Sequence, residues 1–245
     1  MKKTILILIF FILNSCVSIN EILEKDGIFN EKVEIKNISN TEKNVIFIGM
    51  HHFGRKEFYT DVANKTDSLQ KNGYITFYES VTLDSSLDSL TTEIYKKKLR
   101  KIIGLKSVKY YDTISKKIVG KYRYKGEYNL INQPKYSDLN VNMEKALNID
   151  ATVNTLIDEF EKQYGAIKLS ECDKKTTFNS EKYKCRLMDK GLRYRFKSEF
   201  GFDYRNQNLA NEINDFKGDK ILIIYGKAHY EGLINKLQKI DSRWK

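Results

Sequence analysis

The chain has 245 residues, of which 43 are Lys or Arg and 32 are Asp or Glu, so its formal net charge is +11. Hydrophobic residues make up 41% and aromatic residues 12%, which excludes an intrinsically disordered chain. A single proline and 13 glycines exclude a collagen-like or proline-rich protein. Only three histidines occur. Because histidine is the commonest metal ligand and a frequent acid–base group, their positions are the most informative feature of the composition.

The N-terminus has the layout of an export signal. A short basic start precedes an apolar run at 4–13, which is about half the roughly 20 residues needed to span a bilayer. The sequence LNSC follows and resembles a bacterial lipoprotein box, in which the cysteine is lipidated. We therefore expect a signal peptide over 1–15 and a lipid on Cys16. The lipid would hold the protein on a membrane of the cell envelope, at a periplasmic or surface face, where no nucleic-acid partner is expected.

The other two cysteines suit an exported protein. Cys172 and Cys185 form an even pair, and such pairs in exported chains favour a disulfide. They flank Lys- and Thr-rich sequence that is typical of an exposed loop. A zinc site is disfavoured because the two cysteines are far apart and no histidine is near them.

The first half of the predicted fold is a strand–helix–strand unit. The stretch 16–44 is polar and weakly patterned, and it predicts a tether plus an edge segment. A continuous apolar run at 45–48 then predicts a strand that is buried on both faces. Apolar residues at helical spacing follow and stop at an Asn-Gly pair. A second strand is predicted at 74–78, ending at Glu79, and this order implies parallel strands.

Residues 80–195 interrupt this pattern, and we expect them to form a mainly helical insertion over the sheet. Apolar spacing predicts helices around 87–103 and 153–164. The segment 110–128 is rich in Lys and Tyr and is predicted to be a hairpin or a loop. The basic run at 96–101 fits a solvated helix face.

The strand pattern returns near the C-terminus. A helix is predicted near 204–217, a buried strand at 220–225, and a last helix that holds the apolar residues between 233 and 240. We therefore predict one α/β domain over 45–245, with a mixed, largely parallel central sheet flanked by helices.

The histidines lie at two of the predicted strand ends. Gly49 and His52 follow the first strand, and Gly226 and His229 follow the last one, so Gly-x-x-His occurs twice in a strand–turn–helix context. In open parallel sheets, ligands bind at the carboxyl ends of the strands, and glycine permits a close approach of the backbone. Glu79 ends the second strand in the same way. If the three strands are parallel and adjacent, then the two histidines and Glu79 converge.

Two imidazoles and a carboxylate admit two chemistries. They can hold a divalent metal with an open position for water, or Glu79 can orient a histidine that acts as a general base on water. Arg205, at the start of a predicted helix, can bind a substrate carboxylate or stabilise an oxyanion. In the structural alternative, the histidines only cap loops and Glu79 is a solvated strand end.

The same residues resemble the TraB/GumN family. That family belongs to a wider group that contains Tiki proteases, erythromycin esterases and ChaN-like haem-binding lipoproteins. The match concerns 45–80 and 200–240, and the first motif lacks the Gly-Thr start that is usual in the family. Besides the two Gly-x-x-His motifs, the residues that carry the resemblance are Glu79, Arg205, Asn206, Leu209, Ala210, Gly232 and Leu233.

The resemblance implies a catalytic set of His52, Glu79, His229 and Arg205. Tiki-type members are membrane-tethered, metal-dependent peptidases, which implies manganese or cobalt more than zinc, bound by His52, Glu79 and His229. Esterase-type members are thought to use His and Glu on water without a required metal. The expected function is a membrane-anchored hydrolase of peptides or small esters. The alternative is a haem- or metal-binding lipoprotein on the same fold, with His51 as the candidate cofactor-binding residue.

Overall fold

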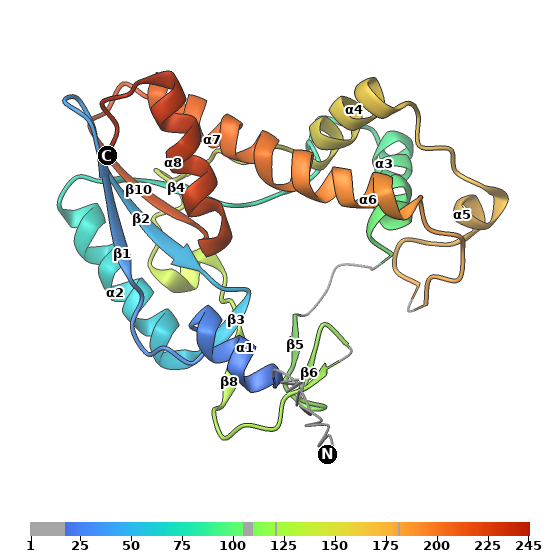
Figure 1. Ribbon diagram of the computed structural model, residues 1–245, viewed down its shortest axis with the longest axis horizontal. Coiled ribbons are helices and arrows are strands. Elements are labelled where there is room, and N and C mark those ends of the chain that lie inside the picture. The colour runs from blue at the N-terminus through green and yellow to red at the C-terminus, as the bar shows by residue number, and fades with distance from the viewer. Residues whose placement is uncertain (1–17, 105–109, 121, 181) are drawn as a thin grey trace, which may run out of the picture.

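The computed structural model describes residues 18–104, 110–120, 122–180 and 182–245. The predicted signal peptide and the predicted lipidation site at Cys16 lie outside these residues. A sheet-centred part contains both the early segments and the C-terminal segments of the chain, and a helical part from the middle lies beside it (Figure 1). Within the described ranges, no helix is long and apolar enough to cross a membrane.

The central sheet has five strands in the order β1-β2-β10-β4-β9. β10 (Lys220–Gly226) lies between β2 (Asn44–Met50) and β4 (Ile75–Tyr78), and it is parallel to both. β9 (Leu147–Asn148) is parallel to β4, whereas β1 (Ile35–Ser39) is antiparallel to β2 at the other edge. The prediction of a mixed, largely parallel sheet flanked by helices is confirmed.

Helices cover both faces of this sheet, which explains the continuous apolar runs of its inner strands. The side chains at 221–225 in β10 are fully buried, each with 0% exposure. One face packs on α7 (Arg205–Asp215) and α8 (Tyr230–Ile240), and the other packs on α2 (Lys56–Lys71) and η1 (Tyr136–Leu139). β10 is therefore held rigidly between two layers, and so is the turn that follows it.

The insertion is helical near its two ends. α3 (Ser89–Ile103), α4 (Val153–Tyr164) and η2 (Phe196–Tyr204) pack around one apolar cluster. The short helices α5 (Glu171–Lys175) and α6 (Lys190–Arg195) complete this helical part. It lies beside the sheet, on the side toward which the arrow of β2 points, and not over a sheet face as expected from the sequence (Figure 1).

Between α3 and α4 the chain consists mainly of short strands and loops. β5 (Tyr111–Asp112), β6 (Lys117–Ile118) and β7 (Tyr122–Arg123) form a small antiparallel sheet in the segment predicted to be a hairpin or a loop. β8 (Leu130–Asn132) pairs with β3 (Phe53–Arg55), directly after the first histidine motif. This part of the insertion therefore packs next to one strand end of the central sheet.

The stretch expected to be a tether and an edge segment is partly a helix. α1 (Ile19–Asp26) begins with a capping box between Ser18 and Glu21 and buries Leu23 against the small sheet. The Ser-x-x-Glu pattern is a recognised helix start, so the sequence did contain the signal for this helix. β1 fills the place of the expected edge segment.

A disulfide joins Cys172 of α5 to Cys185 in the loop that follows. Next to it, Asp173 is buried at 2% exposure and accepts a hydrogen bond from Lys101 of α3 over 2.6 Å. The bridge and the ion pair together tie this loop to the helical part.

Candidate active site

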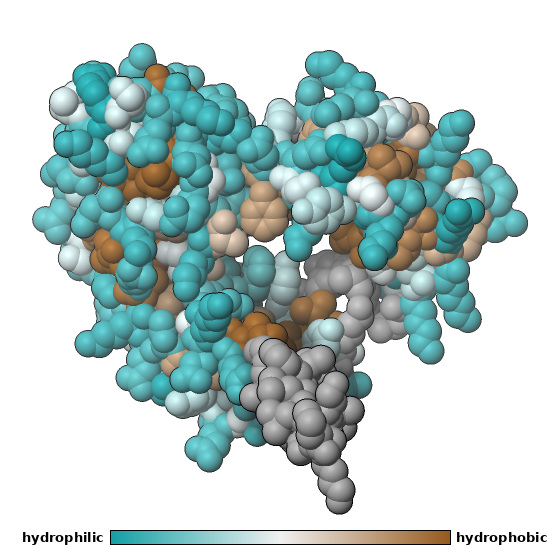
Figure 2. Space-filling model, viewed as in Figure 1, coloured by the Kyte–Doolittle hydropathy of each residue, from teal (hydrophilic) through white to brown (hydrophobic). Residues whose placement is uncertain are grey.

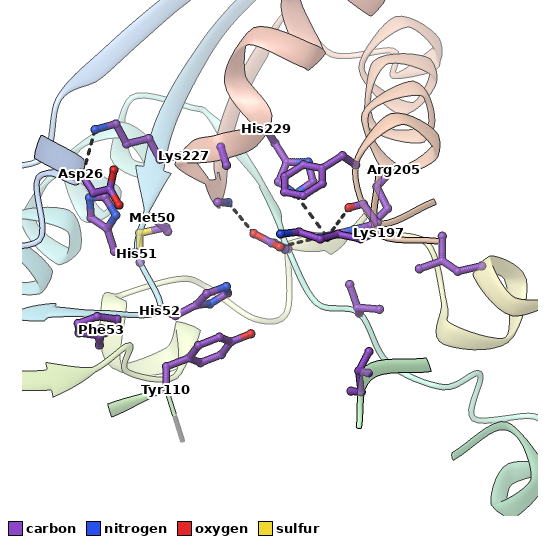
Figure 3. A pocket seen from close by; sticks show the side chains of 18 of the residues that line it. Asp26, Met50, His51, His52, Phe53, Tyr110, Lys197, Arg205, Lys227 and His229 are labelled. Atoms are coloured by element: carbon purple, nitrogen blue, oxygen red, sulfur yellow. Dashed lines mark hydrogen bonds and ion pairs between the residues drawn. The ribbon is translucent and has the colours of Figure 1, made fainter. Parts of the chain in front are cut away.

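The carboxyl ends of three adjacent parallel strands bring the predicted site residues together. His52 follows β2, Glu79 follows β4, and His229 ends η3 (Lys227–His229), directly after β10. With Arg205, they line a cavity of about 1010 Å³ between the sheet-centred part and the helical part. The convergence depends on β10 lying between β2 and β4 and parallel to both, because this arrangement places the carboxyl ends of the three strands side by side. Figure 3 shows His52, Arg205 and His229 around the cavity.

Arg205, the first residue of α7, is the centre of a buried polar network. Its Nε and Nη2 donate to the two carboxylate oxygens of Asp150 over 2.8 and 2.7 Å, and Nη2 also donates to Oε1 of Glu79 over 2.6 Å. Its Nη1 donates to the carbonyl oxygen of Gly201 over 3.2 Å and lies 3.4 Å from Nε2 of His229. These contacts use all five guanidinium N–H groups, and the contact with His229 is the longest.

The network also keeps Arg205 charged. Burial by itself lowers the pKa of the guanidinium. The hydrogen bonds that Arg205 donates to Asp150, together with the nearby negative groups, outweigh burial and raise the pKa above its usual value. Arg205 is therefore a permanent cation between two carboxylates and a histidine.

Both carboxylate oxygens of Glu79 are engaged. Oε1 accepts from Arg205, and Oε2 accepts from the backbone amide of Gly226 over 2.5 Å. A Cβ atom at Gly226 would lie 3.0 Å from Oε2, so glycine is what lets this carboxylate reach the strand. Glu79 therefore positions Arg205 and the end of β10. One sequence hypothesis had it orienting a histidine directly.

His229 is buried at 4% exposure, and its tautomer is fixed by Asn206. Its Nδ1 lies 2.7 Å from Oδ1 of Asn206. An amide oxygen only accepts hydrogen bonds, so Nδ1 carries the proton and Nε2 keeps its lone pair. The rings of Phe202 and Tyr225 lie against the imidazole, with centroids 4.9 and 4.8 Å away.

Burial also keeps His229 neutral. It lowers the pKa of the imidazole to about 4, with Arg205 adding to the decrease and Asp150 opposing it. At neutral pH the ring is therefore an unprotonated acceptor that is held in one orientation. A deprotonated imidazole held in one orientation can accept a proton from water.

His52 projects into the cavity and is exposed. Its ring stacks on Tyr110 with centroids 3.9 Å apart and planes at 8° (Figure 3). The pKa of His52 lies below its usual value because the surrounding protein displaces water, with Glu79 opposing the decrease and Arg205 adding to it. His52 is thus neutral and accessible from the cavity.

His51 leaves the strand end on the side opposite to His52 (Figure 3). It packs on Phe58 with ring centroids 5.2 Å apart and borders the same cavity beside Lys227. Burial lowers its pKa to about 4, with Lys227 adding to the decrease and Asp26 opposing it. The alternation of side chains along an extended chain explains why only one of two adjacent histidines faces Arg205.

Asp150 also belongs to the site, although no sequence motif contains it. Its side chain is fully buried at 0% exposure and accepts from Arg205 and from the hydroxyl of Tyr225, the latter over 2.9 Å. It follows β9 just as Glu79 follows β4, at the same edge of the sheet. A strand of two residues leaves no periodic pattern, so the sequence offered no clear signal for this carboxylate. Asn206 was part of the family resemblance, but its partner His229 could not be read from the sequence.

A π-helix, η2, leads directly into Arg205. It supplies the Gly201 carbonyl that accepts from Arg205, and Phe202, which lies against His229. π-helical turns often occur at functional sites because they change the direction of the side chains that follow.

The donor set does not fit a metal ion in this arrangement. Glu79 already accepts two hydrogen bonds, and Nε2 of His229 faces the guanidinium of Arg205. A divalent cation at this point would lie beside that fixed positive charge. Among the residues that the structure describes, no three His, Cys, Asp or Glu side chains group closely enough to hold a metal.

Comparisons of the chain with models of protein families, with curated proteins and with solved structures give no match. The resemblance to the TraB/GumN family therefore stays a prediction.

Proposed function

We propose that the protein is a hydrolase of esters or amides in which His229 activates water. The observation that supports this proposal is the neutral, oriented imidazole of His229 in the wall of a large cavity. A base that is oriented by a third group is the recurring arrangement in water-activating and nucleophile-activating sites.

In the proposed step, Nε2 of His229 takes a proton from water while the water oxygen forms a bond to the substrate carbonyl carbon. The bond from that carbon to the leaving oxygen or nitrogen then breaks. The proton passes from the imidazolium to the leaving atom, which restores neutral His229. Atoms and charge balance without any further reactant.

Arg205 contributes by position and by charge. Four of its N–H groups are held at 3.2 Å or less, and the fifth makes only the 3.4 Å contact with His229. A contact of that length is weak. This N–H is therefore the one that can exchange its weak contact with His229 for a carbonyl oxygen placed beside it, as negative charge develops there. His52, exposed in the same cavity, would contact the bound substrate or its leaving group.

We also propose that a lipid on Cys16 anchors the protein to a membrane. It would place a hydrolase in the cell envelope, with peptides or small esters as substrates. A metal-dependent mechanism remains a prediction from the resemblance. It would require Glu79 to give up its hydrogen bond with Arg205 in order to bind the metal. Elemental analysis of protein purified without added metal tests that mechanism, with a stoichiometric divalent metal as the result that would support it.

The second candidate is a haem-binding protein. The exposed imidazole of His52 and apolar residues such as Phe202 in one large cavity favour it. In that case the purified protein shows a Soret band, and His51→Asn or His52→Asn removes it. A colourless protein that binds no added haem contradicts this candidate.

The decisive experiment compares variants of the two cavity histidines. The full chain is assayed for release of p-nitrophenol from p-nitrophenyl esters and for cleavage of a peptide mixture. We expect His229→Gln and His52→Ala to lose at least 100-fold in kcat/KM while their circular dichroism spectra stay unchanged. Full activity in both variants contradicts the proposal.

A further inference from the structure

The cavity has two unlike walls. The polar wall holds His52 and His229, which follow strand ends, and Arg205 from the start of α7. The facing wall comes from the helical part and is mostly apolar, although Lys197 of η2 also lines it. Its apolar side chains are Leu99 and Ile103 of α3, Val153 and Leu156 of α4, and Phe196 of η2.

Part of the apolar lining is exposed to solvent although it lies beside the site. Ile103 at the end of α3 is 39% exposed, and Val81, just after Glu79, is also 39% exposed. Figure 2 shows the surface hollowed between the two parts of the molecule, with hydrophobic side chains at the edges of the hollow. Exposed apolar surface in a concave site gains free energy when an apolar ligand covers it.

The apolar wall is preformed because its side chains are packed into the core of the helical part. Leu156 and Phe196 are 4% and 7% exposed and belong to the apolar cluster that joins α3, α4 and η2. The wall therefore does not need to assemble around a ligand. A volume of about 1010 Å³ is far more than a carbonyl group and a water molecule require.

We infer that the substrate carries an apolar acyl group, which lies against α3 and α4 while its carbonyl carbon lies at His229. This inference rests on the proposed hydrolase function and adds the substrate class to it. The occupant of the apolar wall is thus a medium or long hydrocarbon acyl chain. Short, polar acyl groups would leave this wall uncovered.

The test measures kcat/KM for p-nitrophenyl acetate, butyrate, hexanoate and octanoate with the full chain. Burial of one methylene favours binding by about threefold to fourfold, so we expect kcat/KM to rise by at least 50-fold from acetate to octanoate. Equal kcat/KM across the series overturns the inference but leaves the hydrolase proposal intact. Hydrolysis of none of the esters overturns the proposed function.

Two isoleucines of α3 give a matched pair of variants. Ile103 lines the cavity at 39% exposure, whereas Ile94 on the same helix is 40% exposed and is not among the lining residues. We expect Ile103→Asp to lower kcat/KM for octanoate at least tenfold more than it lowers kcat/KM for acetate. Ile94→Asp is expected to change neither value by more than twofold. Equal effects of the two variants overturn the inference.

Binding without turnover gives a separate readout. Sodium octanoate is titrated into the full chain and followed by calorimetry. We expect saturable binding that Ile103→Asp weakens at least tenfold and Ile94→Asp leaves unchanged. Ile103→Trp, which narrows the cavity without adding charge, is expected to shift the preferred ester from octanoate to a shorter chain. No detectable octanoate binding overturns the inference, even if acetate is hydrolysed.

Discussion

Nδ1 of His229 lies 2.7 Å from Oδ1 of Asn206, and this one contact fixes which nitrogen of the imidazole is free to act as a base. Asn206→Leu removes the acceptor, so the ring can rotate or change tautomer. We expect kcat to fall by at least tenfold with a small change in KM. Asn211→Leu on the exposed side of the same helix is the control and should leave kcat within twofold. Equal kcat in the two variants would contradict the assigned role of Asn206.

The same contact can be disturbed from α8. A Cβ atom at Gly232 would lie 2.0 Å from Nδ2 of Asn206, so Gly232→Ala must push the amide away. We expect this variant to lose activity to the same degree as Asn206→Leu. Alanine has a higher helix propensity than glycine, so the substitution by itself should not destabilise α8. A large loss of activity with only a small loss of stability would therefore show that Gly232 acts by positioning Asn206.

The pH dependence of activity identifies the base. A general base works only when deprotonated, so activity falls as the pH decreases through its pKa in the folded protein. The pKa of His229 is lowered to about 4 by burial. We expect the acid limb of kcat/KM to have its midpoint near pH 4, measured over the range in which the fold is intact by circular dichroism. An acid limb near the ordinary histidine value of about 6.5 would contradict His229 as the base.

Arg205 compensates the charges of the buried Asp150 and the partly buried Glu79, so its loss is predicted to affect stability as well as rate. Arg205→Ala leaves Asp150 buried without a cation, and breaking a buried pair in this way costs about 3–5 kcal/mol. Arg243 is the comparison, because its side chain is 54% exposed and its ion pairs lie at the surface. Arg243→Ala should cost no more than about 1 kcal/mol. Urea unfolding measures both, and similar losses would contradict the buried network.

The disulfide is predicted to matter for stability and not for chemistry. Cys172 and Cys185 are 13 residues apart, and closing a loop of about that length contributes roughly 3 kcal/mol. Cys172→Ser with Cys185→Ser should lower Tm while kcat at 25 °C changes by less than twofold. A large loss of kcat in the double variant would show that the loop acts on the site.

The position of the two Gly-x-x-His motifs at strand ends could be predicted because strongly patterned strands precede them. Buried parallel strands produce continuous apolar runs, and the residues that end such runs lie at one edge of a sheet. The strand order that brings His52 and His229 together is not encoded locally, so it entered the sequence argument as a condition. The hydrogen-bond partners of the site side chains are even harder to predict from the sequence. Whether Glu79 contacts a histidine or Arg205 depends on how far α7 reaches across the sheet.

The misplaced elements have similar causes. The insertion was expected over the sheet, but α3 and α4 bury their apolar faces against each other and against η2. β9 has only two residues, too few for a strand pattern, so the sequence did not indicate that Asp150 lies at a strand end. α1 lies in a polar, weakly patterned stretch, and its local signal is the capping box between Ser18 and Glu21.

The place of β10 in the sheet has a consequence for how the chain folds. β2 and β4 lie early in the sequence, yet each forms its inner hydrogen bonds only with β10, which comes near the end of the chain. Until that late segment has been synthesised, two apolar strands have unpaired edges that can recruit other chains. A chain truncated before Lys220 is therefore expected to aggregate instead of forming a smaller domain. The end of the sheet that carries the candidate active site would therefore be assembled last.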